Sequence, residues 1–584
     1  MVPSHTSSAV LEPPARRSLE QTLALDSIFP NDTRTLIDDL LAEQQRLTAV
    51  ERFAQHHERG DALATTGIYR DLIPARLPGE GEQFAFSVDL DACSGCKACV
   101  TACHNLNGLD EEETWRGVGL LHGGDAILPF QQTVTTACHH CLDPACLNGC
   151  PVLAYDKDPR TGIVRHLDDQ CIGCQYCILK CPYDVPKYSA RRGIVRKCDM
   201  CANRLAVAEA PACAQACPNG AITITIVSQP AIVADAGRGA FLPGSPDPAY
   251  TMPTTRYRSA RGLPVNLIAA DHHQVRPEKA HPPLVIMLVL TQLSVGAFCV
   301  DTLLRACFPA NLMNQISPGH ALIALLLGLL ALGASTLHLG RPQYAWRAIL
   351  GLRNSWLSRE IVAFGLFAML AALAAAAWWW PPLRVLDRGR AGFSPLAAAV
   401  CISGSLGVFC SIIIYQDTRR PFWNGPATTF KFFGTTAMLG AAVLLFLATL
   451  QALLFPVVAT EGAYHQLTDF LTASLAAISV CKLIAEAAVF RHLRQPGITA
   501  SPLKRTAMLL TGELVEITTA RYLLGGIGGI ILPLSFLAQQ PAPGFATLGV
   551  TLWILLFAVG GELVERYLFF VAVVASKMPG GLAA

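Results

Sequence analysis

Two patterns of apolar and polar positions divide this 584-residue chain. From Leu284 onward, eight apolar segments follow one another, each near the ~20 residues that a helix needs to cross a bilayer. One such segment alone is also typical of a buried helix in a soluble protein. Eight in series, with aromatic residues such as the tryptophans at 378–380 near their ends, predict a membrane bundle. We expect spans at 284–304, 320–339, 360–380, 395–415, 432–454, 468–490, 508–537 and 546–575.

The patterns before Leu284 are shorter. Runs of strand-like composition at 84–90, 162–167 and 221–226 predict strands, and residues 33–58 have the periodicity of an amphipathic helix. Proline recurs through 229–283, which predicts an extended linker. We therefore expect an N-terminal extension (1–81), an α+β domain (82–228), a proline-rich linker (229–283) and an all-α, eight-helix transmembrane domain (284–580).

Composition supports the membrane prediction and narrows the function. Charged residues make up 15% of the chain, against about 25% in an average soluble protein. The net charge of +2 gives no reason to expect nucleic acid as a partner. Arg16 and Arg17 invite a twin-arginine interpretation, but Glu20 and Asp26 interrupt any apolar region after them, so we predict no export signal.

Sixteen of the 21 cysteines lie between 93 and 217 in four groups of four. Groups one and three have the spacing C-x2-C-x2-C-x3-C, which wraps a cubane iron–sulfur cluster in bacterial ferredoxins. Three closely spaced thiolates reach three irons of one cube, whereas the fourth ligates a neighbouring cluster, so such groups work in pairs. The groups are Cys93, Cys96, Cys99 and Cys103; Cys138, Cys141, Cys146 and Cys150; Cys171, Cys174, Cys177 and Cys181; and Cys198, Cys201, Cys213 and Cys217.

Structural zinc and disulfides are the alternatives for these cysteines. Zinc sites usually combine two separated C-x2-C pairs, and disulfides need an oxidising compartment. Four consecutive four-cysteine groups in a chain without an export signal fit neither. We therefore predict four [4Fe–4S] clusters in a ferredoxin-like domain built from a tandem pair of dicluster units, and we call residues 82–228 the cluster domain.

The distribution of basic residues predicts the side of the membrane on which the cluster domain lies. Eight spans put both termini on one side, where the loops carry eleven Arg and Lys residues, against four in the loops on the other side. The positive-inside rule then places the cluster domain in the cytoplasm. These loops could instead serve contact with the cluster domain, and a chain can be exported with a partner that carries the signal.

A cluster domain attached to a bilayer domain suggests electron exchange with a lipid-soluble quinone. A b-type haem in the bundle would need axial histidines inside helices. We expect His320 and His338 at the two ends of the second span, His465 in a loop and His492 just past the sixth span. No pair then faces across the bundle, so we predict no haem.

His338 and Glu360 are the candidate quinol site. Gly340 and Pro342 end the helix that carries His338, and Glu360 opens the third span at the same depth. Quinol oxidation releases two protons, and an imidazole can accept one near neutral pH. A histidine at a helix end is also common in a purely structural role, so spacing alone leaves both interpretations open.

Other charged residues lie within the predicted spans. Lys482 and Glu486 are four residues apart on one helical face, as are Glu562 and Arg566, and the sequence Gly-Glu-Leu-Val-Glu occurs at 512–516 and again at 561–565. Intramembrane carboxylates are costly and usually face the interior of a bundle. We favour internal ion pairs that fix helix packing, with proton conduction as the alternative.

The motifs resemble a known arrangement. Residues 169–177 (DQCIGCQYC) and 197–201 (KCDMC) resemble the iron–sulfur subunit of the dimethyl sulfoxide reductase family. Residues 335–340 (STLHLG), 358–361 (SREI) and 561–563 (GEL) resemble the membrane anchor subunit of that family. The resemblance covers about residues 82–228 and 284–578, so two subunits are similar to two parts of this one chain.

This resemblance implies cluster pairs one with four and two with three, and a site for menaquinol or another quinol at His338 and Glu360. It also implies a separate molybdopterin-containing catalytic subunit as partner, because nothing in this chain supplies a molybdenum pocket. The chain itself is then a non-catalytic redox subunit that meets the lipid bilayer and its quinone, with no nucleic acid involved. Cys177 is intact, so four cubane clusters are implied rather than a three-iron variant.

Three functions follow as hypotheses. Electrons pass from quinol through the clusters to a reductase of S-oxides, N-oxides or similar acceptors, or they run in reverse from a dehydrogenase or sulfur-compound oxidoreductase to quinone. The third hypothesis, a transporter with a regulatory iron–sulfur domain, would need broken spans in paired halves. Only the seventh predicted span, with glycines at 525–529, looks broken.

Overall fold

The computed structural model describes residues 35–38, 41, 71–125, 127–380, 382–383, 394–454, 461–496 and 500–580. The chain divides into two units, 1–65 and 66–584. In the first unit, residues 36–38 are helical, and most of the helix expected over 33–58 lies outside the described residues. The second unit contains the cluster domain, the proline-rich segment and the apolar helices.

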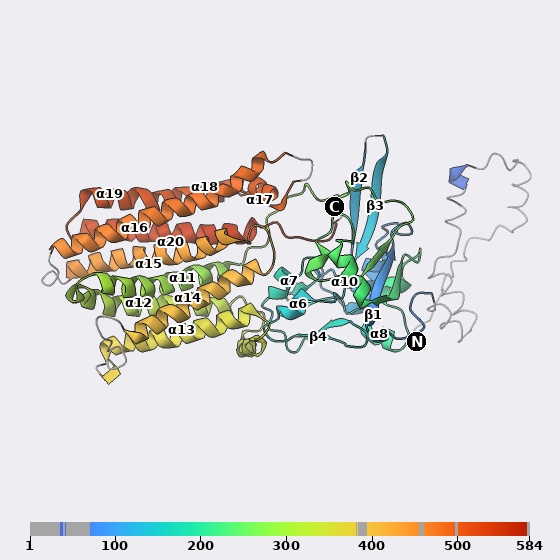
Figure 1. Cartoon of the computed structure of the whole chain (residues 1–584), viewed down its shortest axis with the longest axis horizontal. Coiled ribbons are helices and arrows are strands. Elements are labelled where there is room, and N and C mark those ends of the chain that lie inside the picture. Colours follow the sequence, from blue (N-terminus) through green and yellow to red (C-terminus); the bar gives the residue numbers. More distant parts are fainter. Residues whose placement is uncertain are drawn as a thin grey trace, which may run out of the picture. The chain divides into compact units, whose positions relative to one another are not determined.

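The cluster domain is built from small sheets joined by short helices (Figure 1). β1 (Glu82–Asp89) lies at the centre of a sheet with the order β8-β1-β9 and pairs antiparallel with β8 (Ile222–Ser228). A second sheet has the order β10-β2-β3, in which β2 (Gly117–Gly124) and β3 (Pro129–Thr136) form a long hairpin. Two further hairpins pair β4 (Tyr155–Lys157) with β5 (Val164–His166) and β6 (Lys187–Ser189) with β7 (Ile194–Arg196). The three predicted strands correspond to β1, β5 and β8, and the predicted α+β fold is confirmed.

The proline-rich segment differs from the extended linker that we expected. It contains the helix α10 (Gln229–Gly237) and two short strands. β9 (Arg256–Arg258) pairs parallel with β1, and β10 (Ile268–Ala269) pairs antiparallel with β2. Both strands lie at sheet edges, where neighbouring prolines do not interrupt a ladder. Much of the segment is therefore packed against the cluster domain.

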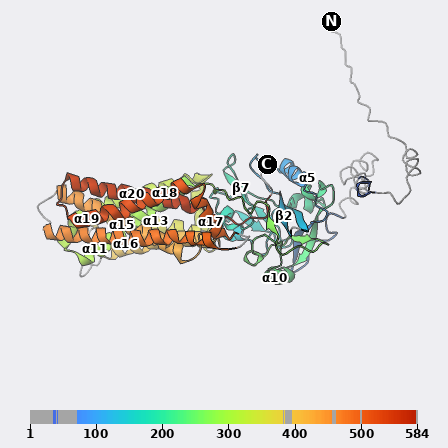
Figure 2. The same ribbon diagram turned by 90° about the horizontal axis from the view of Figure 1, so that it is seen from above.

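The second half of the chain is a bundle of long helices that run side by side in both views (Figures 1 and 2). Eight helices in the described part are long and apolar enough to cross a membrane, as predicted. The first five and the last of these are single helices. The elements are α11 (Pro282–Cys307), α12 (Ala310–Thr336), α13 (Trp356–Trp379), α14 (Pro395–Gln416), α15 (Pro426–Leu454), α16 (Glu461–Ala487), α18 (Val515–Gly526) with α19 (Leu532–Gln539), and α20 (Phe545–Val571).

Three details of the bundle correct the expectations. α12 begins at Ala310, so His320 is buried inside the helix rather than at its end. His465 lies in α16 and not in a loop. The seventh span begins only at Val515, because α17 (Pro502–Thr511) ends at Gly512, and a π-helical stretch at Ile527–Ile531 joins α18 to α19. α12 and α16 begin in polar sequence before the apolar run, at 310–319 and 461–467, so apolar length alone did not reveal these helix starts.

Residues 572–580, which we call the tail, follow the last span and return to the cluster domain. The N–H of Leu120 in β2 donates to the carbonyl oxygen of Gly580 at 3.1 Å. The side chain of Lys577 pairs with buried Asp271 at 2.6 Å, and Met578 is buried in the core of the cluster domain. The tail thus holds the cluster domain to the end of α20.

Candidate functional site

The cysteines gather into four sets, and each set combines the first three cysteines of one group with the last cysteine of the paired group. Cys93, Cys96 and Cys99 line a cavity of about 300 Å³ together with Cys217 from group four. We call these residues set one. The last cysteine of group four has crossed to group one, as ligands do when two cubane motifs are paired.

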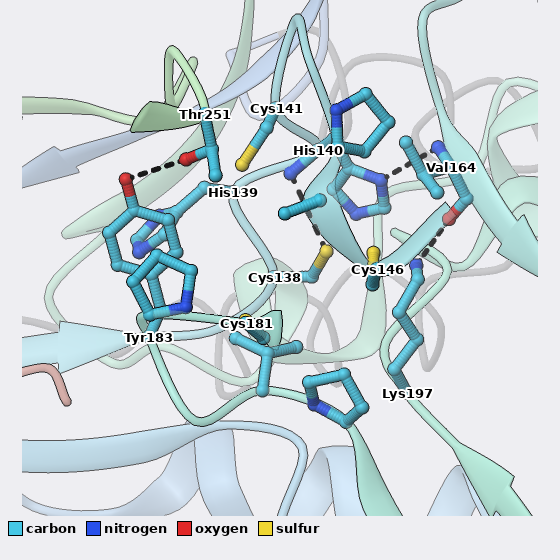
Figure 3. Close-up of a pocket in the computed structure, with 15 residues that line it drawn as sticks. Cys138, His139, His140, Cys141, Cys146, Val164, Cys181, Tyr183, Lys197 and Thr251 are labelled. Carbon is cyan, nitrogen blue, oxygen red and sulfur yellow. Dashed lines mark hydrogen bonds between the residues drawn. The ribbon is translucent and has the colours of Figure 1, made fainter. Parts of the chain in front are cut away.

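Set two has the same construction. The first three cysteines of group two surround about 370 Å³ of empty space with Cys181, the last cysteine of group three (Figure 3). The buried histidines His139 and His140 lie beside them, and Nδ1 of His140 accepts a hydrogen bond from the N–H of Val164 at 3.0 Å. Set two consists of Cys138, Cys141, Cys146 and Cys181.

The remaining cysteines form two further sets. In set three, Cys150 lies among the first three cysteines of group three. In set four, Cys103 from group one lies among the first three cysteines of group four. Groups one and four thus exchange one cysteine each, and so do groups two and three, which is the pairing implied by the family resemblance. Set three is Cys150, Cys171, Cys174 and Cys177, and set four is Cys103, Cys198, Cys201 and Cys213.

The backbone between the cysteines turns so that N–H groups point at sulfur. Gly173 (φ 71°) and Gln175 (φ 60°) are left-handed, and α7 (Tyr176–Lys180) begins directly after them. The N–H of Gly173 then lies 3.4 Å from Sγ of Cys171. The N–H groups of Met200, Ala154 and Ala221 contact Sγ of Cys198, Cys150 and Cys217 in the same way, at 3.4, 3.2 and 3.2 Å. Such donors stabilise thiolates and tune a bound cluster.

The cysteine sets do not have the arrangement of a site for a single metal ion. Among the described residues, no three His, Cys, Asp or Glu side chains are close enough together to hold one metal ion. The cysteines of sets one and two instead line a common space from several directions, as ligands to separate irons must. Bound cubanes would supply one-electron carriers.

Set three contacts the bundle through the helix α7, which carries Cys177. The hydroxyl of Tyr176 donates to the carbonyl oxygen of Ile414 in α14 at 3.1 Å. The ammonium group of Lys180 bonds to the carboxylate of Asp417 at 2.6 Å, and only 5% of the Lys180 side chain is exposed. Tyr176 belongs to the same buried cluster as residues of α11, α13 and α14. These contacts were not predicted, although an aromatic residue between two ligands of group three was a visible signal in the sequence.

Three glycine backbones meet at this contact. A Cβ on Gly340 would lie 2.1 Å from the carbonyl oxygen of Gly193, and one on Gly173 would lie 2.9 Å from the nitrogen of Gly340. The N–H of Arg341 donates to the carbonyl oxygen of Ile172 at 3.0 Å. The end of α12 and the loop of set three therefore approach more closely than any side chain would allow.

His338 lies at this junction, half-buried. Its Nε2 is 3.3 Å from the carbonyl oxygen of Cys174, and its ring packs edge-on against His281 with centroids 5.1 Å apart. Because a carbonyl oxygen only accepts, Nε2 must carry the hydrogen, which leaves Nδ1 as the acceptor nitrogen. Nδ1 has no hydrogen-bond partner in the described part of the chain. Burial, and then His281, lower the pKa of His338 to about 4, so the imidazole is neutral at pH 7.

Glu360 lies near Tyr176 of the set three loop. It is buried in α13 and accepts a hydrogen bond from the hydroxyl of Ser411 in α14. It has no cation partner within the described ranges, and no hydrogen bond joins it to His338. Tyr176 is an electrostatic neighbour of Glu360, so His338 and Glu360 meet the same loop without touching each other.

A second cluster of charged residues is buried in the other half of the bundle. Lys482 pairs with Glu486 at 3.2 Å, as favoured from the sequence, and also with Glu562 at 2.6 Å. Arg521 pairs with both carboxylates, at 2.8 Å to Glu486 and 2.9 Å to Glu562. The expected pair of Glu562 with Arg566 does not form, because Arg521 from α18 and Lys482 from α16 satisfy Glu562 instead. Residues 512–514 of the first repeat lie in the break before α18, so the two repeats have different environments.

Some of the basic loop residues have structural partners. Arg341 and Arg347 donate to the carbonyl oxygens of Asp168 and Asp169 at 2.9 and 2.7 Å. Contact with the cluster domain, the alternative left open above, thus accounts for part of the excess of basic residues in these loops.

Two families of known proteins match the two halves of the chain. The 4Fe–4S dicluster domain matches residues 130–226, and the DMSO reductase anchor subunit (DmsC) family matches residues 279–571. This protein belongs to the dimethyl sulfoxide reductase anchor family. Because its first half is an iron–sulfur subunit, we refer to it as the fused subunit.

Relatives of the cluster domain have related names. An anaerobic dimethyl sulfoxide reductase subunit of Haemophilus influenzae is 35% identical over 157 residues, which cover 25% of the fused subunit and 76% of the relative. The probable anaerobic dimethyl sulfoxide reductase chain YnfG of Escherichia coli is 38% identical over 144 residues, 23% and 70% of the two chains. The formate dehydrogenase-O iron-sulfur subunit of E. coli is 34% identical over 158 residues, 24% and 52%. The fused subunit is thus an iron–sulfur electron-transfer protein with a multi-pass membrane anchor.

Proposed function

We propose that the fused subunit transfers electrons between a membrane quinol and a separate molybdopterin-containing catalytic subunit. In this proposal four [4Fe–4S] clusters occupy sets one to four, and electrons run from quinol to a reductase of S-oxides, N-oxides or similar acceptors. The observation that carries the proposal is the contact of set three with the bundle, where His338 contacts the carbonyl oxygen of Cys174 and Glu360 lies near Tyr176 of the same loop.

The adjacency of the sets supports a single route away from the membrane. Sets two and three are adjacent because both are built from the cysteines of groups two and three. Set four adjoins set two, because Cys198 lies close enough to Cys138 for the charges of the two side chains to interact. Sets four and one share groups one and four. The order is then three, two, four, one. Cys96 of set one is exposed, so we place the catalytic subunit at that end. The excess of basic residues in the loops supports a cytoplasmic position for the cluster domain.

The residues at the junction offer two acceptors on the path of the protons that quinol oxidation releases. Because the pKa of His338 is about 4, its neutral imidazole relays a proton rather than holding it at pH 7. A quinol hydroxyl group can donate to Nδ1 of His338, since Nε2 is already committed to the carbonyl oxygen of Cys174. Glu360 has a hydroxyl partner and no cation partner in the described part of the chain, so its carboxyl group suits proton transfer better than ion pairing. The two electrons leave on the side of set three, one at a time.

The test measures reduction of the clusters by a quinol analogue in membranes that contain His338→Gln or Glu360→Gln. Loss of a positioned proton acceptor typically lowers a rate by about 10²- to 10⁴-fold. We expect quinol-dependent reduction to fall by that order, while the iron content and the reduction by dithionite stay unchanged. His465→Gln, in the same bundle, and exposed Glu513→Gln are the matched controls. Wild-type rates in both test variants would refute the site.

A second candidate function is the same route in reverse, from a quinone-reducing dehydrogenase to the membrane. The similarity to the formate dehydrogenase-O iron-sulfur subunit and to the hydrogenase-2 operon protein HybA, 36% identical over 160 residues, favours it. A redox titration discriminates the two directions, because cluster potentials well below that of the quinol couple would support the reverse one.

A further inference from the structure

Arg116 is a buried cation among cysteines. It follows Trp115 at the start of the β2 hairpin and is only 2% exposed. Its Nη1 donates to Oγ1 of Thr135 at 3.2 Å, and the same hydroxyl lies 3.5 Å from Sγ of Cys99 in set one. Nε and Nη2 are buried without a hydrogen-bond partner. No carboxylate pairs with Arg116 among the described residues, and its strongest charged neighbours are Cys213, Cys99, Cys198 and Cys103, which belong to sets one and four.

Lys197 occupies the corresponding place between sets four and two. It is 2% exposed and lines the cavity of set two, and it directly precedes Cys198 of set four. Its ammonium group donates to the carbonyl oxygen of Val164 (Figure 3). It also donates to the carbonyl oxygen of Cys198 at 2.8 Å. Both partners are uncharged, and Lys197 has no ion pair in the part of the chain that the structure describes.

A buried, unpaired cation is costly unless a negative group lies beside it. The neighbouring arginine shows the usual solution, because Arg196 is also buried but pairs with Glu113 at 3.0 Å. A cubane held by four thiolates is negative and becomes more negative when it is reduced. In the low dielectric of the domain interior, a cation between two such sites favours the reduced state of both.

We propose that Arg116 and Lys197 are positioning residues that raise the reduction potentials of the clusters in pairs, Arg116 acting on sets one and four and Lys197 on sets four and two. The inference rests on the proposed occupation of the four sets by clusters. Set four lies between the two cations, so both raise the reduction potential of its cluster. The cations therefore raise this potential more than that of any other set.

The experiment is a redox titration of the complete fused subunit in membranes, followed by electron paramagnetic resonance of the individual clusters. In Arg116→Gln, we expect two signals to titrate at lower potential, with at least a tenfold loss in the ratio of reduced to oxidised cluster at fixed potential, ~59 mV for one electron. In Lys197→Gln, two signals should also shift, and one of them should be shared with the first variant. Arg116→Lys keeps the positive charge, so its reduction potentials should lie close to those of the wild type. Arg196→Gln removes a charge that is already paired with Glu113 and should change the potentials little.

The outcomes are separable from those of the proposed function. Iron content and the wild-type spectrum establish first whether four clusters are present. With four present, unchanged potentials in both Gln variants, or an equal shift of all four signals, would overturn the inference. If Arg116→Gln fails to retain iron but Arg116→Lys retains it, the positive charge is needed, which supports the inference. If both variants lose iron, the inference is overturned for Arg116.

Discussion

Gly340→Ala adds one methyl group at the closest contact between the end of α12 and the cluster domain. The new Cβ would lie 2.1 Å from the carbonyl oxygen and 2.6 Å from the carbonyl carbon of Gly193. Ordinary van der Waals contact begins at 3.4 Å, so the two backbones have to separate by more than 1 Å. Neither is the flexible end of a side chain, and the carbonyl oxygen of Gly193 also abuts Gly173 in the loop of set three.

Overpacking of this kind costs about 1–3 kcal/mol. If the whole cost destabilises the contact between the bundle and set three, the equilibrium between the docked and the separated arrangement shifts toward separation by roughly 5- to 150-fold. The variant removes no ligand and no proton acceptor. We therefore expect slower quinol-dependent reduction of the clusters, with an unchanged iron content and unchanged reduction by dithionite.

Gly333→Ala is the matched control, because it lies in α12 and a Cβ there would meet nothing within 4 Å. Stopped-flow absorbance after mixing with a quinol analogue gives the rate, and iron analysis gives the occupancy. Equal rates for Gly340→Ala and the wild type would refute the view that the glycine contact sets the distance between the quinol site and set three.

Two further predictions concern stability and the tail. Glu562→Gln removes the carboxylate that holds Lys482 and Arg521, and breaking a buried pair in this way should cost about 3–5 kcal/mol, seen as a lower unfolding temperature in detergent. Exposed Glu513→Gln should stay within about 0.5 kcal/mol of the wild type, and equal unfolding of the two variants would contradict a stabilising role for the charged cluster. Gly119→Ala places a Cβ 1.8 Å from the carbonyl oxygen of Pro579, so trypsin should cleave the tail after Lys577 faster, as measured by mass spectrometry. Gly117→Ala in the same strand, where the nearest atom would be 3.7 Å away, should not, and an equal cleavage rate in both would show that the tail does not need β2.

The sequence was most informative where local spacing decides structure. The cysteine motifs defined the groups, and the exchange of Cys217 and Cys181 between groups follows from the short reach of three consecutive ligands. Apolar length was enough to predict the number of spans. His338 was placed correctly at the face of the bundle that meets the cluster domain, but the helix expected to carry it ends at Thr336, two residues before it.

The missed features depend on contacts between residues far apart in the chain. Lys180 and Asp417 are 237 positions apart, and neither is unusual in its local sequence. The spacing of Glu562 and Arg566 allowed a pair one turn apart, but helix packing brings Lys482 and Arg521 to Glu562 instead, at 2.6 and 2.9 Å. The strands β9 and β10 are two or three residues long, too short to show an alternating pattern.

The tail imposes an order on biogenesis. Residues 572–580 are translated after all eight spans, and their contacts with Leu120 and Asp271 cannot exist before then. The ribosome has completed the cysteine-rich region, with all four cysteine groups, long before the tail can make these contacts. The cluster domain is therefore still free of this tether while the eight spans are being synthesised.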